Sequence, residues 1–192
     1  MDWKDITLKQ YLDIRDIQKT SSNPANSLIE YFFDVHDAES TLPATEYLAK
    51  LRELGFIGKE RPSVKVKGEY TLNGRVYVLQ AIPTALSTAQ YIDFDNYNRT
   101  GDVAGVLSVV LIPKTAKHYN DGYDIEQVKA DILTMSVIDV DAVNAFFLKT
   151  LKRYIKIFRR CLSKLSRTEG MEQTAPMLET LTKAAGELCR MS

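Results

Sequence analysis

Histidine is the side chain best suited to acid–base catalysis near neutral pH, and this sequence contains two, His36 and His118. His36 follows Asp34-Val35 at the predicted end of a helix, where its cationic form complements the helix dipole without catalysis. His118 lies in a turn-rich loop. Neither stands beside a nucleophile or a metal ligand, and the sequence has no glycine motif for a phosphate or a dinucleotide. We therefore expect a protein that is not an enzyme and needs no cofactor.

Acidic residues close together in the sequence are candidates for binding a divalent cation. The segment 93–98 partly matches a calcium loop, but Tyr97 lacks a short oxygen ligand and Asn98 stands where glycine is needed. The pair Asp93 and Asp95 could instead hold manganese beside a nucleotide sugar. Solvated acids at a helix end explain the same residues without a metal, and we predict no metal site there.

A second acidic group follows the turn-rich loop. Asp121, Asp124 and Glu126 could collect a cation, but an ordinary Asp-Gly turn and a helix N-cap explain them without one. A small enzyme with an unrecognised site therefore stays the third hypothesis. Its residues would be Asp93, Asp95 or His118.

The strongest signal in the sequence is a run of cations without acids. No Asp or Glu lies between Asp141 and Glu169, and apolar residues recur every three or four positions in this stretch. They include Val143, Phe147, Leu151, Tyr154, Phe158, Cys161 and Leu165. The spacing predicts one amphipathic helix over 141–167, capped by Asp139 or Asp141 and about 40 Å long, with its cations on the opposite side. The cations expected to contact a partner are Lys149, Lys152, Arg153, Lys156, Arg159, Arg160 and Lys164.

The net charge of the whole chain is zero and so does not reveal the basic character of this helix. The 192 residues contain 25 Lys and Arg and 25 Asp and Glu, but without the eight cations of 149–167 the balance is 17 to 25, a net of −8. A basic rod on an acidic body favours contact with proteins, either copies of the chain or others. Contact with the backbone of duplex DNA is the alternative. Single-strand binding is disfavoured because the basic side carries no aromatic residue for stacking.

The other elements can be predicted from caps and periodicity. Thr7 caps a first helix with Leu8 and Ile14 inward, a second helix runs over 25–35, and Pro43 opens a third that stops at Gly55. The side chains of the third helix expected to face inward are Tyr47, Leu48, Leu51 and Leu54. Further helices are predicted over 84–97, 102–111, 124–135 (capped by Asp124) and 175–189, with a hinge at 166–174.

Residues 63–80 change to a period of two. Asn73-Gly74 between alternating runs predicts a hairpin of the strands Ser63–Tyr70 and Arg75–Gln80. A lone hairpin is marginal in water, so it must lie on the helices or be completed by a strand from another chain. The predicted fold is α+β, mainly α, with six or seven helices and one hairpin. Residues 1–140 form the body, and 141–192 form the basic helix and a last helix, in the same domain or as an assembly arm.

Composition sets the broad class of protein. Hydrophobic residues make up 45% and charged residues 26%, which is typical of globular chains. The charged start, Met1 to Asp5, does not fit a secretory signal, and the longest apolar run, 103–113, is too short to span a membrane. We expect a soluble protein without a membrane partner. Cys161 and Cys189, far apart in the sequence, fit a reducing compartment.

Several segments of the sequence resemble proteins encoded in the structural gene clusters of tailed bacteriophages, notably crAss-like phages of Bacteroidales. The matching segments, in order, are 3–11 (WKDITLKQY), 70–77 (YTLNGRVY), 88–94 (TAQYIDF), 111–113 (LIP), 119–124 (YNDGYD) and 146–147 (FF). Together they span 3 to about 147 and do not cover the basic helix.

The resemblance implies a non-enzymatic virion or assembly protein. Members of this group are tail-assembly chaperones, subunits of neck or tail rings, portal–tail connectors, or proteins packed in the particle. The implied partners are copies of the chain and other phage structural proteins, with DNA in the particle's channel as the alternative. The implied location is the neck or tail of the virion, and the host cytoplasm during assembly.

Overall fold

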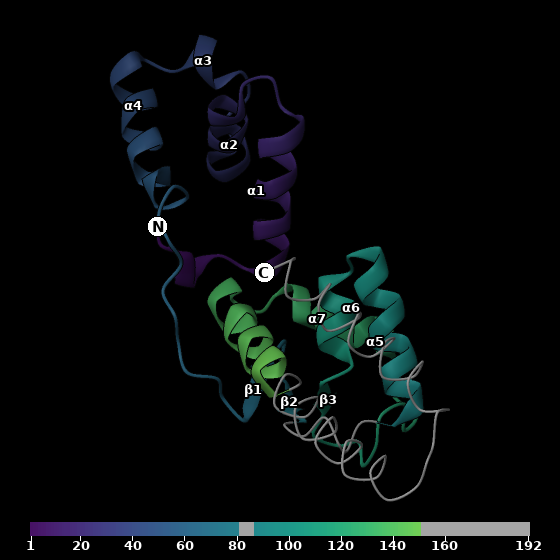
Figure 1. Ribbon diagram of the computed structural model, residues 1–192. Coiled ribbons are helices and arrows are strands. Elements are labelled where there is room, and N and C mark those ends of the chain that lie inside the picture. The colour runs from purple at the N-terminus through teal and green to yellow at the C-terminus, as the bar shows by residue number, and fades with distance from the viewer. Residues whose placement is uncertain (81–86, 151–192) are drawn as a thin grey trace, which may run out of the picture.

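The computed structural model describes residues 1–80 and 87–150, and its fold is α+β and mainly helical, as predicted (Figure 1). The elements form two groups, joined by the segment 57–68, which begins with a turn and forms no helix or strand. The first group contains η1 (Trp3–Asp5), α1 (Leu8–Thr20), α2 (Pro24–Phe33), α3 (Ala38–Thr41), α4 (Ala44–Glu53) and η2 (Leu54–Phe56), where η is a 3₁₀ helix. The second contains β1 (Glu69–Leu72), β2 (Arg75–Leu79), α5 (Thr88–Thr100), α6 (Val103–Ser108), β3 (Leu111–Pro113), α7 (Ile125–Leu133) and a helix over 137–150.

The predicted helix starts agree with the structure where a capping residue gave the signal. Thr7 and Gln10 form a capping box at α1, and the Asp124 carboxylate accepts a hydrogen bond from the Glu126 N–H at the start of α7. Ser87 and Gln90 form a second box at α5. That helix therefore begins at Thr88 rather than at 84, and residues 81–86 lie outside the described part.

The hairpin is confirmed, with one correction. Asn73 and Gly74 both have positive φ, 48° and 77°, as a tight two-residue turn requires. Glu69–Leu72 pairs antiparallel with β2, and the last pair of the ladder is Glu69 with Val78, so residues 63–68 form no strand. The predicted strand Ser63–Tyr70 was therefore wrong over most of its length.

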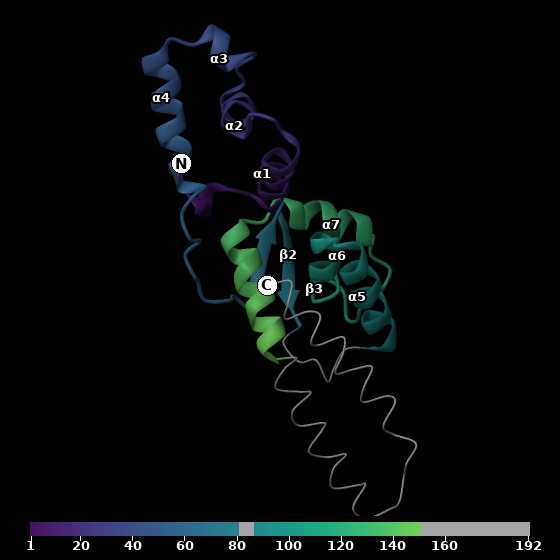
Figure 2. The same ribbon diagram turned by 45° about the horizontal axis from the view of Figure 1, so that its top comes forward.

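The hairpin is completed by its own chain rather than by another one. β3 pairs antiparallel with β2 in the sheet order β1-β2-β3. The predicted helix 102–111 was wrong at its end, because α6 stops at Ser108 and Leu111 begins β3. A nearly continuous apolar run is compatible with a buried helix or a buried strand, and here it contains both. Figure 2 shows β1 and β2 between helix 137–150 and the group α5 to α7.

Two hydrophobic clusters form the core, and each takes one residue from the other group. The larger cluster lies under the sheet, where Phe94 of α5 packs on Phe147 at 5.2 Å between ring centroids, and it includes Leu8 of α1. The smaller cluster lies among the N-terminal helices and includes Val137. Each group therefore completes the core of the other.

The two groups also share main-chain hydrogen bonds. The Leu8 N–H donates to the Met135 carbonyl and the Val137 N–H to the Ile6 carbonyl, both at 2.8 Å, around an isolated antiparallel bridge between Thr7 and Ser136. The start of α1 is thus fixed to the start of helix 137–150.

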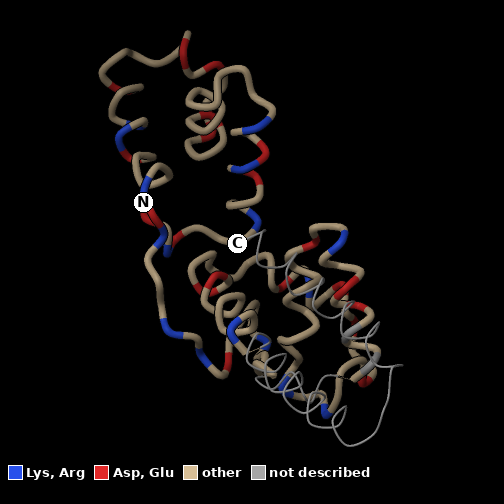
Figure 3. Tube along the Cα trace, in the orientation of Figure 1, with Lys and Arg blue, Asp and Glu red and all other residues tan. Residues whose placement is uncertain are grey.

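The start of the basic helix differs from the prediction. The helix begins at residue 137, so Asp139 and Asp141 are not its caps but lie in its first turns. There they form ion pairs with Lys67 and Arg61 of the segment 57–68. Figure 3 shows cations along that segment. The boundary proposed at 140/141 falls inside this helix, and the predicted hinge at 166–174 and helix 175–189 lie outside the described residues.

Within 1–80 and 87–150, no helix is long and apolar enough to cross a membrane.

Candidate partner-binding surfaces

Helix 137–150 carries the first part of the predicted basic surface. Val143 is fully buried and Phe147 nearly so, which confirms the apolar side of the predicted helix over 141–150, and Lys149 is exposed. The other predicted contact residues lie outside the described part of the chain, and their role stays a prediction. They are Lys152, Arg153, Lys156, Arg159, Arg160 and Lys164.

The carboxylates considered for metal binding on α5 have partners of their own. Asp93 accepts a hydrogen bond from the Tyr119 hydroxyl at 2.9 Å, and Asp95 pairs with Arg99 one turn along the helix at 2.5 Å. Burial, and then the hydrogen bond to Asp93, raise the pKa of Tyr119, so this hydroxyl stays protonated and donates.

The residues of the second acidic group also have separate partners, and the histidines do not lie in a common site with them. The Asp121 carboxylate accepts from the Lys117 N–H at 3.0 Å, and Asp124 caps α7. His36 and His118 are both exposed. Among the described residues no group of three His, Cys, Asp or Glu is placed to hold a metal ion.

Asp131 is a buried aspartate that the sequence analysis did not single out, and its hydrogen bonds connect the hairpin to α7. Asp131 is only 1% exposed, and its two carboxylate oxygens accept four side-chain hydrogen bonds. The donors are the Tyr77 hydroxyl at 2.5 Å, Arg75 Nη1 at 2.8 Å, Asn73 Nδ2 at 2.9 Å and Gln127 Nε2 at 3.0 Å. Three of the donors come from the hairpin, so this group is a structural connection between β1–β2 and α7.

The protonation of Asp131 follows from these contacts. Burial alone would raise the pKa of its carboxyl group, but the hydrogen bonds from Tyr77, Asn73, Arg75 and Gln127 outweigh burial and lower the pKa to about 2. Burial and the neighbouring carboxylate raise the pKa of Tyr77. Asp131 is therefore ionised and Tyr77 protonated at neutral pH.

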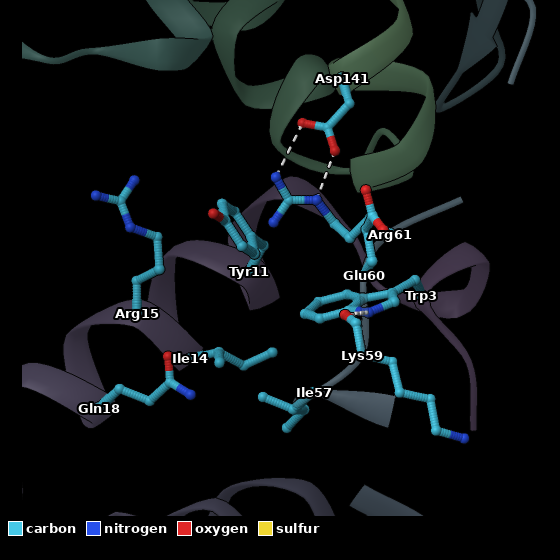
Figure 4. Close-up of a pocket in the computed structure, with 10 residues that line it drawn as sticks. All are labelled: Trp3, Tyr11, Ile14, Arg15, Gln18, Ile57, Lys59, Glu60, Arg61 and Asp141. Carbon is cyan, nitrogen blue, oxygen red and sulfur yellow. Dashed lines mark hydrogen bonds and ion pairs between the residues drawn. The ribbon is translucent and has the colours of Figure 1, made fainter. Parts of the chain in front are cut away.

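A pocket of about 500 Å³ lies where the two groups of elements meet (Figure 4). It is lined by α1, by η1, by the segment that follows η2 and by the start of helix 137–150. The side chains used below are Trp3, Tyr11, Arg15, Lys59, Glu60 and Arg61.

Arg61 organises this junction pocket. Its Nε donates to one carboxylate oxygen of Asp141 at 2.5 Å and its Nη2 to the other at 3.3 Å. The same guanidinium lies 4.6 Å from the centre of the Tyr11 ring and 5.7 Å from that of Trp3. The Trp3 indole is fixed in turn, because its N–H donates to the Lys59 carbonyl at 3.0 Å. Cation and aromatic rings therefore form a preorganised wall.

A third surface is apolar and lies on α4. None of the residues of this helix is buried, and two of its leucines are prominent, Leu48 at 50% and Leu51 at 37% exposure. The prediction that both face inward was wrong, whereas Leu54 is buried and Tyr47 is half-buried. Figure 1 shows α4 at the outer side of the N-terminal helices, next to α2.

The class of protein that these observations define is a mainly helical α+β domain with a junction pocket and an exposed apolar helix. Comparison with protein-family models, with curated proteins and with solved structures finds no match.

Proposed function

We propose that this chain is a non-enzymatic structural or assembly protein of a tailed bacteriophage. It acts by contact with copies of itself and with other phage proteins in a neck or tail ring, within the virion and, during assembly, in the host cytoplasm. The likeness of 3–11, 70–77 and 119–124 to phage structural proteins supports the phage assignment. The exposed surfaces support action by contact.

The observation that carries the proposal is the apolar side of α4. Exposing Leu48 and Leu51 to water costs free energy that burial against another protein would recover, at about 25 cal/mol per Å² of apolar surface. The leucines are spaced by three residues and so lie on one side of the helix. A helix that contributes no buried residue to its own fold gains most from a partner.

Size-exclusion chromatography with light scattering tests this role. We expect the wild-type chain to form a species larger than a monomer, and the variant with Leu48→Ser and Leu51→Ser to lose it while its circular dichroism is unchanged. The control is Ile92→Ser on α5, which removes an equally exposed apolar side chain, 53% exposed, from the other group of elements. A double variant that assembles as well as the wild type would contradict the role of α4.

The basic stretch gives an independent test of assembly. Reversing Lys152, Arg153, Lys156 and Arg160 to Glu should abolish assembly without changing the circular dichroism of the monomer. Unchanged assembly would remove the predicted basic helix from the proposal.

DNA binding is the second candidate, and the run of cations without acids over 142–168 favours it. A salt titration against duplex DNA separates the two functions. A steep fall of log K with log salt supports DNA contact, whereas no binding at low salt excludes it. If the chain is instead a tail-assembly chaperone, mass spectrometry of purified particles will not find it among the virion proteins.

A further inference from the structure

We propose that the junction pocket binds an acidic, extended segment of a partner protein, whose carboxylates are held by Arg15 and Arg61 beside the aromatic rings. The inference rests on the proposed action by protein contact, but it concerns a surface different from α4 and from the basic stretch.

Arg61 is placed to donate to a carboxylate from outside its own chain. Two of its nitrogens, Nε and Nη2, are used by Asp141, and Nη1 is left on the side of Tyr11 in Figure 4. A guanidinium has five N–H donors in a fixed plane, so one carboxylate does not exhaust it. The rings of Tyr11 and Trp3 hold that plane in place, which reduces the entropy lost when a ligand binds.

The charges at the rim favour an anion. Arg15 and Lys59 form no ion pair with any residue in 1–80 or 87–150. Arg15 lies 5.8 Å from the Tyr11 ring centre, on the side of the pocket opposite Lys59 in Figure 4. Glu60 opposes these two cations, and Asp141 neutralises Arg61. The lining therefore keeps one net positive charge, with Glu60 as the group that an acidic ligand must overcome.

The shape of the site favours a chain segment over a compact ligand. The pocket is open, and its cations stand apart at the rim rather than converging on one point (Figure 4). Arg15 and Arg61 lie 5.8 Å and 4.6 Å from the centre of the same ring, that of Tyr11, and successive acidic side chains of an extended peptide can reach both. Its lining from both groups of elements also lets one segment contact α1 and helix 137–150 together.

Trp3 gives the assay a reporter inside the site. It is the only tryptophan in the chain, it lines the pocket and it contacts Arg61. We would titrate the full-length protein with a blocked peptide of alternating glutamate and glycine and follow tryptophan fluorescence. The reference ligand is the same peptide with glutamine in place of glutamate. We expect a saturable change with the glutamate peptide alone, weakened by added salt.

Three substitutions of exposed residues test whether positive charge at the pocket raises the affinity for the glutamate peptide. Arg15→Glu should weaken binding of the glutamate peptide by at least about threefold, and Glu60→Gln should strengthen it by about twofold, as expected for exposed ion pairs. Lys19→Glu makes the same charge change on α1 outside the pocket and should leave affinity within about twofold.

The proposal is overturned if neither peptide changes the fluorescence, if both act alike, or if Arg15→Glu and Lys19→Glu have equal effects. Inorganic phosphate and a short DNA duplex are tested in parallel, and equal or tighter binding of either would overturn the peptide assignment in favour of a general anion or a nucleic-acid site. Because the readout is peptide binding to one chain, loss of assembly in the α4 variant leaves it unaffected. The two proposals can therefore fail separately.

Discussion

Replacing Asp131 by Ala tests whether the hairpin is held to α7 by one buried carboxylate. The substitution leaves the hydroxyl of Tyr77, itself 1% exposed, without its acceptor. Arg75 is half-exposed, and Asn73 and Gln127 are exposed, so these three donors return to water at small cost. Leaving a buried hydroxyl without its partner costs about 1–3 kcal/mol. We expect a loss near 3 kcal/mol, at the upper end of this range, because the hydrogen bond that is lost was made to a charged group.

Two further substitutions separate charge from hydrogen bonding. Asp131→Asn keeps the shape and one carbonyl oxygen, and the amides of Asn73 and Gln127 can rotate to accept from its new NH₂ group. We expect a cost of about 1–2 kcal/mol. Tyr77→Phe removes one donor and should cost a similar amount. Asp95→Ala is the control, because its ion pair with Arg99 is partly exposed and should be worth less than about 1 kcal/mol.

The pH dependence of stability gives a second measurement of the same group. The pKa of Asp131 is lowered in the folded state, from 3.8 to about 2, so its contribution is complete above pH 4 and is lost as the pH falls through 2. The shift corresponds to about 2 kcal/mol. Between pH 5 and pH 2 the stability difference between the wild type and Asp131→Ala should narrow by that amount.

Urea unfolding followed by circular dichroism provides the free energies for all of these variants. The reasoning would be refuted if Asp131→Ala cost less than about 1 kcal/mol, since a buried carboxylate that accepts four hydrogen bonds should contribute more than that. It would also be refuted if the difference from wild type stayed constant down to pH 2.

Two other substitutions test local packing and capping. Gly105→Ala should destabilise the protein by about 1–3 kcal/mol, because the new Cβ would lie 2.4 Å from the Tyr97 ring, whereas Gly58→Ala, with nothing within 4 Å, should leave the melting temperature unchanged. Equal melting temperatures for the two variants would contradict this packing. Thr7→Ala should cost about 1 kcal/mol in urea unfolding through loss of the α1 capping box, and a wild-type midpoint would mean that the cap is dispensable.

The features that could be predicted from the sequence are those whose signal is local. Thr7 and Asp124 identify helix starts because an N-cap bonds backbone groups two or three residues away. Asn73-Gly74 identifies the turn because positive φ at two successive positions suits few other residues. Such signals need no knowledge of the rest of the fold.

The features that were missed depend on residues far apart in the sequence. Asp131 reads as an ordinary acid within α7, and its donors Asn73, Arg75 and Tyr77 lie 54 to 58 positions earlier in the chain. Arg61 and Asp141 are separated by 80 positions. A carboxylate on a predicted helix gives no sign of which distant donors will bury it.

Leu48 and Leu51 show a different limit. Periodicity places both on one side of α4, and that part of the prediction needs only helix geometry. The pattern cannot say whether the apolar side meets its own core or another protein. In the structure Leu48 and Leu51 meet solvent, whereas Tyr47 packs on the smaller core cluster and Leu54 is buried in it.

Helix 137–150 contributes residues to both core clusters and to the junction pocket. Val137 belongs to the smaller core, while Val143 and Phe147 belong to the larger one, so the helix cannot turn about its axis without losing apolar contacts in both. The ion pair of Asp141 with Arg61 adds a charged contact at the junction pocket. A partner segment bound there would contact the guanidinium that orients the start of this helix, and Lys149 lies two turns further along it. The two cores therefore fix the side on which Lys149 projects relative to the junction pocket.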